Sequence, residues 1–290
     1  MTPRIDRHMV TINGVRQVHY RRAGSGPPVV LLHQSPTSSG EFIPLIHALA
    51  AEFTVFAPDT PGNGLSDPLP GEWPSMEAFA DGVIELLSAL GLKNVPIYGF
   101  HTGGSCALAL GLRHPEKMPL YIMNGYIQLE AAETADILAH YLPAYRTDWS
   151  GAHLTWTWAR FREQLMFFPW YRTDNQSRLF WDLPPPERSQ WSVMEFMRAG
   201  DNYRRPYQAA LKFDTASAVR NMKANMVIMT QGTDLLDKYM DVMPAPPTNV
   251  ATARPADAVE AIGMVTDLFR RHAKGAAPPV VPTEPLSNKT

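Results

Sequence analysis

The chain has 290 residues, of which 45% are hydrophobic and 19% charged, and this composition excludes an intrinsically disordered protein. Its 26 basic and 28 acidic residues give a net charge of −2 without a basic cluster, so we expect no nucleic acid and no anionic membrane as a partner. A single cysteine, Cys106, excludes an intrachain disulfide framework and favours the reducing cytoplasm as the location.

The first half of the chain predicts strands that alternate with helices. Two amphipathic strands precede the continuous apolar run of residues 27–33, which is typical of a buried strand. Further strands are expected at 53–59, 95–100 and 118–125, and helices between them. One of these helices begins after the N-cap Ser75 and ends at Gly91. Strands joined by helices of this length predict a mostly parallel sheet and an α/β fold.

The alternation stops for about a hundred residues and then returns. A strand is expected at 224–232 and a last helix at 255–272, so residues 1–124 and 224–273 form the predicted core and 125–223 a helical cap. The cap holds six of the seven tryptophans: Trp149, Trp156, Trp158, Trp170, Trp181 and Trp191. Together these rings predict an apolar cavity beneath the cap. The tail, 274–290, is rich in proline and polar residues and is expected to be mobile.

Three ordered motifs carry a family resemblance. They are "LLHQSPTSSGEF" from Leu31 to Phe42, "DTPGNGLSD" from Asp59 to Asp67, and "GFHTG" from Gly99 to Gly103. In wording and spacing they resemble the oxyanion loop, the following strand-end loop and the nucleophile elbow of the α/β-hydrolase superfamily, closest to its haloalkane dehalogenase and epoxide hydrolase branch. The resemblance implies a mostly parallel twisted sheet flanked by helices, with a helical cap.

Two departures from this family concern the chemistry. The position that carries the nucleophile in the family is His101 here, and the C-terminal region that normally supplies the relay histidine contains none. The nearest, His272, ends the final helix beside two arginines, where a solvated cation complementing the helix dipole is expected. The usual serine–histidine relay is therefore expected to be absent.

A histidine on the elbow predicts a different catalytic pair. The resemblance places an acid after strand 224–232, and Asp234 is the first candidate, with Asp237 as the fallback. A carboxylate that fixes one ring nitrogen of His101 leaves the other to act as a general base. By resemblance, the backbone N–H groups of Ser35 and Thr102 form an oxyanion hole. Gln34 replaces the family's usual glycine, so its side chain either restricts this loop or adds a polar contact.

The other candidate residues concern the pocket and possible cofactors. The aromatic and imidazole side chains proposed for the pocket wall are Phe100, His140, His153, Trp156 and Trp158. His33 is expected to hold the oxyanion loop rather than react. The sequence contains neither the Cys/His spacing of a metal site nor a glycine-rich phosphate loop before a lysine, so we expect no metal and no cofactor.

These features favour a cofactor-independent hydrolase that acts on a small apolar molecule, cyclic or aromatic, through water deprotonated by His101. An ester or lactone is the first expectation for the bond that breaks. A lyase that cleaves a C–C or C–O bond by proton abstraction is the second reading, and a non-catalytic small-molecule binder is the third. A homodimer remains open.

Overall fold

The computed structural model describes residues 3–273, so the tail predicted to be mobile lies outside the described residues. Eight strands form one sheet in the order β1-β2-β4-β3-β5-β6-β7-β8. Their bounds are β1 (Asp6–Ile12), β2 (Arg16–Ala23), β3 (Pro28–Leu32), β4 (Thr54–Pro58), β5 (Ile97–Phe100), β6 (Tyr121–Asn124), β7 (Met226–Met229) and β8 (Val250–Ala253). Strands β3 to β8 run parallel, and only β2 is antiparallel to its neighbours β1 and β4. The predicted α/β class with a mostly parallel sheet is confirmed.

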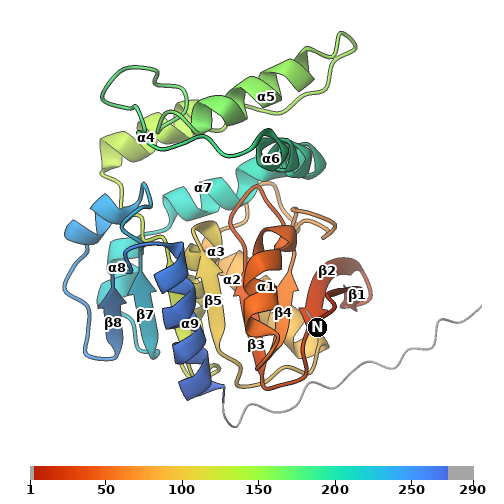
Figure 1. Ribbon diagram of the computed structural model, residues 1–290, viewed down its shortest axis with the longest axis vertical. Helices are drawn as coiled ribbons and strands as arrows, with labels where there is room; N and C mark the ends of the chain where they lie inside the picture. The colour runs from red at the N-terminus through yellow and green to blue at the C-terminus, as the bar shows by residue number, and fades with distance from the viewer. Residues whose placement is uncertain (1–2, 274–290) are drawn as a thin grey trace, which may run out of the picture.

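Helices cover both faces of this sheet, as Figure 1 shows. One face packs against α1 (Ile43–Leu49) and α9 (Ala258–His272), and the other against α2 (Met76–Ala89), α3 (Thr102–Arg113) and α8 (Thr215–Arg220). Successive residues of β3 point to opposite faces and are buried on both, since Val29 and Leu31 join one cluster and Val30 and Leu32 the other. This double burial explains why the sequence of β3 is uniformly apolar.

The helix predicted from Ser75 is α2. The Ser75 side chain accepts a hydrogen bond from the amide of Ala78, and Gly91 follows the helix with a φ of 65°. Its buried side chains, among them Phe79, Val83 and Leu86, pack in the cluster that also holds α3. The N-cap and the terminal glycine predicted for this helix are thus confirmed.

A cap stands over the carboxyl ends of the parallel strands (Figure 1). It contains α4 (Ala131–His140), α5 (Ala152–Gln164), α6 (Pro186–Ala199) and α7 (Arg204–Lys212), with α7 nearest the sheet. The cap has an apolar cluster of its own, formed by Ile137, Tyr141, Leu142, Phe161, Val193, Phe196, Ala199 and Tyr203. Helix α8 also lies within the predicted range 125–223, but Ala218 and Val219 pack in the main core instead.

Among residues 3–273, the structure contains no helix that combines the length and the apolar character needed to cross a membrane.

Candidate active site

His101 stands on a sharp turn between β5 and α3. Its φ of 48° and ψ of −110° are rare for a residue with a side chain, and such strain is typical of a functional turn. The flanking glycines make the turn possible. A Cβ on Gly99 would lie 2.0 Å from the carbonyl oxygen of Gly103, and one on Gly103 would lie 2.1 Å from that of Leu32. The glycine frame of the motif is therefore a steric requirement.

The ends of three neighbouring strands bring His101 and Asp234 together. His101 follows β5, Gly125 follows β6 and Asp234 lies in the loop after β7, and these strands are adjacent in the sheet. The imidazole passes over Gly125 and its Nε2 lies 2.7 Å from Oδ2 of Asp234. The amide of Leu236 donates to the other carboxylate oxygen, Oδ1, over 2.9 Å. Asp237, the fallback acid, faces away, with its Oδ1 3.6 Å from Nε of Arg254.

The electrostatic environment favours an ion pair between these two side chains. Burial opposes the charge on His101, but the Asp234 carboxylate, its hydrogen bond and the charge of Glu41 together raise the pKa of the imidazole above 6.5. Burial also opposes the charge on Asp234, but the nearby imidazole and the Leu236 amide hold the pKa of that carboxyl below its usual value. His101 is consequently more often protonated near neutral pH than a free histidine.

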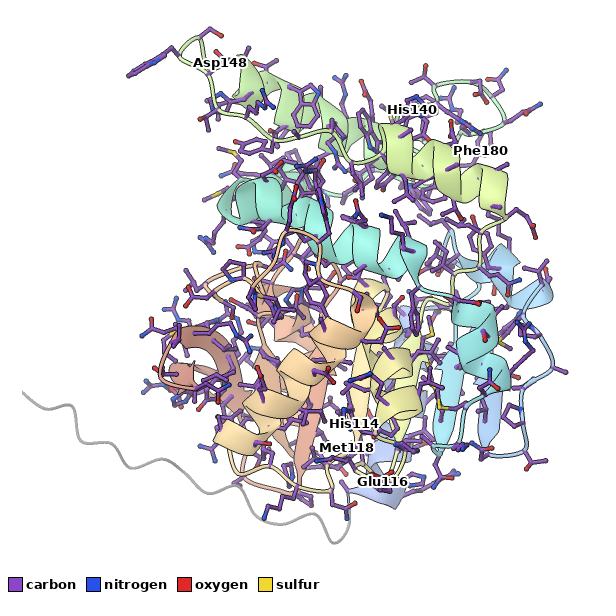
Figure 2. All side chains as sticks on the ribbon, turned by 180° about the vertical axis from the view of Figure 1, so that it is seen from behind. His114, Glu116, Met118, His140, Asp148 and Phe180 are labelled. Atoms are coloured by element: carbon purple, nitrogen blue, oxygen red, sulfur yellow. The ribbon has the colours of Figure 1, made fainter. Side chains whose placement is uncertain are left out.

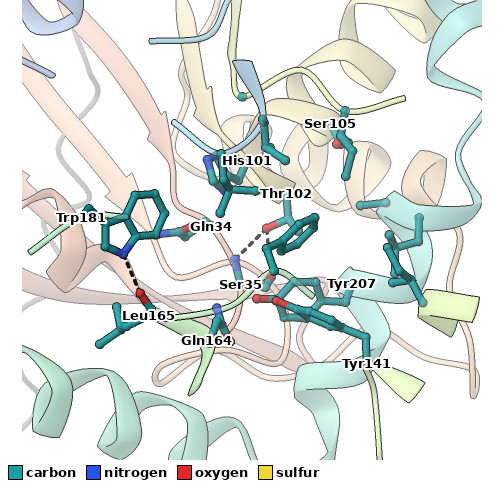
Figure 3. A pocket seen from close by; sticks show the side chains of 18 residues that line it. Gln34, Ser35, His101, Thr102, Ser105, Tyr141, Gln164, Leu165, Trp181 and Tyr207 are labelled. Carbon is teal, nitrogen blue, oxygen red and sulfur yellow. Dashed lines mark hydrogen bonds between the residues drawn. The ribbon is translucent and has the colours of Figure 1, made fainter. Parts of the chain in front are cut away.

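A cavity of about 220 Å³ lies between this turn and the cap (Figure 3). His101 contributes to its wall on the core side, with its side chain 22% exposed. The rest of the wall is largely apolar and includes Ile127, Ile137, Leu165, Phe168, Trp181, Leu211, Leu235 and Leu236. Two tyrosines of the cap, Tyr141 and Tyr207, add hydroxyl groups. Such a cavity suits a small apolar molecule that carries few polar atoms.

The oxyanion loop differs from the predicted arrangement. The amide of Ser35 donates to the side-chain oxygen of Thr102 over 2.7 Å, so this N–H is already engaged. The amide of Thr102 begins α3, and no acceptor takes its proton within the described residues. Gln34 lines the cavity, but its side-chain amide donates to Glu41. Only one of the two predicted backbone donors is therefore free.

The five side chains expected in the pocket wall lie elsewhere. Phe100 packs toward the face of the sheet that α1 and α9 cover, with its ring centre 4.2 Å from that of His101. His140, whose side chain is 60% exposed, lies on the outer side of the cap (Figure 2). His153 accepts a hydrogen bond from the amide of Asp148. Trp156 packs against Trp170 and Phe196 inside the cap, and Trp158 is exposed to solvent.

The sequence reasoning missed the rings that do line the cavity. Tyr141 lies just after α4, Tyr207 on α7, and Phe168 and Trp181 in the segment between α5 and α6. The one available signal was the aromatic richness of the whole cap, which does not tell which rings face inward. Of the six cap tryptophans only Trp181 reaches this cavity.

His33 and Asp59 hold the loops around the site. The amide of Thr60 donates to Nε2 of His33, which leaves the proton on Nδ1 for the carbonyl oxygen of Gln34. Asp59 accepts from the amides of Ser39 and Leu65 and from His19. In agreement with the sequence, His33 is a buried support of the oxyanion loop. Within residues 3–273 the structure has no group of three His, Cys, Asp or Glu side chains that could hold a metal ion.

A family model described as the alpha/beta hydrolase fold matches residues 27–244. The chain belongs to the α/β-hydrolase family. Over 108 residues this α/β-hydrolase is 45% identical to the soluble epoxide hydrolase of Corynebacterium sp. (strain C12), a match that covers 37% of each chain. Over 126 residues it is 36% identical to the serine hydrolase BPHL of Homo sapiens, with 41% of this chain and 43% of the human protein covered.

The sequence matches therefore span less than half the length of either curated relative. The structural similarity to known proteins covers more of the chain than these sequence matches do. The crystal structure of bromoperoxidase from Bacillus anthracis superposes with a TM-score of 0.69 at 18% identity, over 92% of this chain and 100% of that one. At this identity the likeness shows the fold alone.

Proposed function

We propose that this α/β-hydrolase cleaves an activated ester or lactone of a small apolar molecule, cyclic or aromatic, with His101 as general base and Asp234 as its partner. The single observation that carries the proposal is the 2.7 Å contact between Nε2 and Oδ2. It joins a titratable ring on the elbow to a buried acid, at the wall of a largely apolar cavity.

The contact decides which nitrogen acts as the base. A carboxylate only accepts hydrogen bonds, so in the neutral imidazole Asp234 holds the proton on Nε2. The lone pair is then on Nδ1, which is the atom that takes a proton from water. The resulting hydroxide attacks the carbonyl carbon, and the amide of Thr102 donates to the oxyanion that forms. When the intermediate collapses, the Nδ1 proton passes to the departing oxygen, so no acyl-enzyme is needed.

The test uses an aromatic lactone, dihydrocoumarin, and an aromatic ester, 4-nitrophenyl acetate. We expect turnover of at least one of them at mildly alkaline pH. In His101→Ala, kcat/KM falls by about 10²–10⁴-fold, which is the usual contribution of a general base. A fluorophosphonate probe leaves the protein unlabelled, because no serine stands on the elbow. Labelling at a serine, or full activity in His101→Ala, contradicts the proposal.

One observation favours proton abstraction, the lyase reading, as a second candidate. The amide of Ser35 is engaged by Thr102, so a tetrahedral oxyanion meets fewer donors than in the usual oxyanion hole. A base that only removes a proton from carbon has less need of them. Exchange of an α-proton of a small ketone for deuterium in heavy water, dependent on His101, distinguishes this reaction from hydrolysis. Affinity for such molecules without turnover or exchange supports the third reading, a binder.

A further inference from the structure

Arg160 is buried in the cap, and its guanidinium forms no salt bridge among residues 3–273. The residue is 1% exposed and lies on α5. Its Nε and Nη2 have no hydrogen-bond partner within residues 3–273. The guanidinium carbon lies 5.1–5.6 Å from the centres of five rings: Tyr141, Phe161, Trp170, Phe196 and Tyr203. Cation–π attraction offsets only part of the cost of burying this charge. The remaining cost indicates that Arg160 has a role besides packing.

The directed contact of this guanidinium is with Gln164. Nη1 of Arg160 donates to Oε1 of Gln164, one helical turn further on, over 2.9 Å. A guanidinium has no acceptor atom, so the oxygen of the Gln164 amide must face Arg160. The Nε2 group of Gln164, with two N–H donors, then faces the other way. Arg160 thus fixes the orientation of an amide that would otherwise turn freely.

Gln164 presents these donors where two cavities meet. It lines the cavity at His101 and also a neighbouring cavity of about 240 Å³, together with Gln34, Ser35 and Leu165. Figure 3 shows Gln164 near Tyr141 and Tyr207 on the cap side, and His101 on the core side. The amide adjoins the hydroxyl of Tyr207, which occupies one donor at most. At least one N–H therefore remains for a ligand.

We propose that Gln164, oriented by Arg160, is a specificity-determining donor that binds a carbonyl oxygen of the ligand on the cap side of the cavity. This names the substrate class more closely: a cyclic or aromatic molecule with a carbonyl group remote from the bond that reacts at His101. Gln164 contacts the ligand, and Arg160 is a positioning residue that acts through Gln164. The inference deepens the proposed function, but it concerns binding and does not require that His101 catalyses hydrolysis.

The experiment compares two ligands that differ in one atom group, 1-indanone and indane. Binding is followed by quenching of tryptophan fluorescence, since Trp181 lines the cavity. We expect 1-indanone to bind about fivefold more tightly, the usual worth of one neutral hydrogen bond. Because neither compound has a hydrolysable bond, failure here is distinct from failure of the proposed hydrolysis.

Variants assign the preference to the two residues. Gln164→Met keeps the length and removes the donors, so the preference for the ketone disappears while indane still binds. Arg160→Met lowers the preference in the same way, and the double variant adds nothing to Gln164→Met alone. Gln190→Met, an exposed glutamine on α6, is the matched control and keeps the preference.

Two results overturn the proposal. The first is a ketone preference in Gln164→Met as large as in the unaltered protein, and the second is equal affinity of the unaltered protein for both compounds. If Arg160→Met does not fold, the ketone preference of Gln164→Met decides whether the proposal holds. The melting temperature of Gln164→Met is measured to show that this variant is folded.

Discussion

The imidazole of His101 lies so close to Gly125 that a Cβ on the glycine would stand 2.4 Å from Cδ2 of the ring. Gly125 has a φ of 94° and lies at the end of β6, between the strands that carry His101 and Asp234. The middle strand must therefore end in a residue without a side chain if the ring is to cross over it to the acid.

Gly125→Ala tests this relationship. The new methyl group moves the ring away from Asp234, so kcat/KM for an aromatic ester falls by about 10²-fold or more, and the positive φ lowers stability by about 1 kcal/mol. Activity and urea unfolding give the two effects separately. The matched control is Gly263→Ala on α9, where no atom lies within 4 Å of the new Cβ. There we expect full activity and a gain of about 0.5–1 kcal/mol. Equal activity of both variants contradicts the steric argument.

Asp234→Asn tests how the acid acts on the ring. The amide lacks the charge that raises the pKa of His101, and its NH₂ group can hold the ring with the proton on Nδ1 instead of Nε2. We expect kcat/KM to fall by about 10²–10⁴-fold and the pKa of His101, followed by NMR, to decrease. The control is Asp237→Asn, three residues further on, where the natural side chain pairs with Arg254. We expect this variant to leave kcat/KM and the pKa of His101 unchanged. The same loss in the Asp237 variant would show that charge in this loop, not the direct contact, is what counts.

The pH dependence of catalysis follows from the raised pKa of His101. The ring acts as a base only when neutral, so kcat/KM increases as pH rises through the folded-state pKa, which lies above 6.5. A pH–rate profile of the free enzyme measures this limb. In Glu41→Gln, which removes a second nearby negative charge, the limb shifts to lower pH. A limb below pH 6.5 in the unaltered protein contradicts the assignment of His101 as the base.

Asp59 contributes stability that depends on pH. Burial opposes its charge, but His19, Ser39 and Leu65 donate to it and lower its pKa from 3.8 to about 2. A carboxyl whose folded pKa is depressed stabilises the fold above the unfolded value and loses that contribution as pH falls from 3.8 to about 2. The difference is worth about 2 kcal/mol at neutral pH. Urea unfolding measures the free energy of unfolding of the unaltered protein and of Asp59→Asn. We expect the difference between the two to decrease as the pH approaches 2, and a difference that is constant with pH contradicts this account.

The sequence predicted the core of the fold because its signals are local. The apolar run of β3, the N-cap and buried face of α2, and the glycines around His101 each depend on residues close in the chain. The contact between His101 and Asp234 joins residues 133 apart, and only the resemblance to a known family made it predictable. The pocket wall was not predictable residue by residue, since which face of each cap helix turns inward depends on how the helices pack on one another.

The oxyanion loop is a second region in which the contacts could not be predicted from the sequence. The hydrogen bond from the Ser35 amide to the Thr102 side chain joins the oxyanion loop to the first residue of α3, and the motif wording alone does not reveal it. The same holds for Gln34, whose side chain donates to Glu41 further along the same "LLHQSPTSSGEF" motif. Tertiary hydrogen bonds of this kind decide which donors remain free, and a pattern of residue types does not encode them.

The separation of His101 from Asp234 also bears on synthesis of the protein. The ribosome completes β5 and the elbow first, then the whole cap, and only afterwards the loop that carries the acid. Until β7 joins the sheet, Asp234 is absent from the elbow, and the imidazole lacks the largest of the contributions that raise its pKa. On the proposed mechanism, a nascent chain is therefore inactive until the last third of the polypeptide has folded.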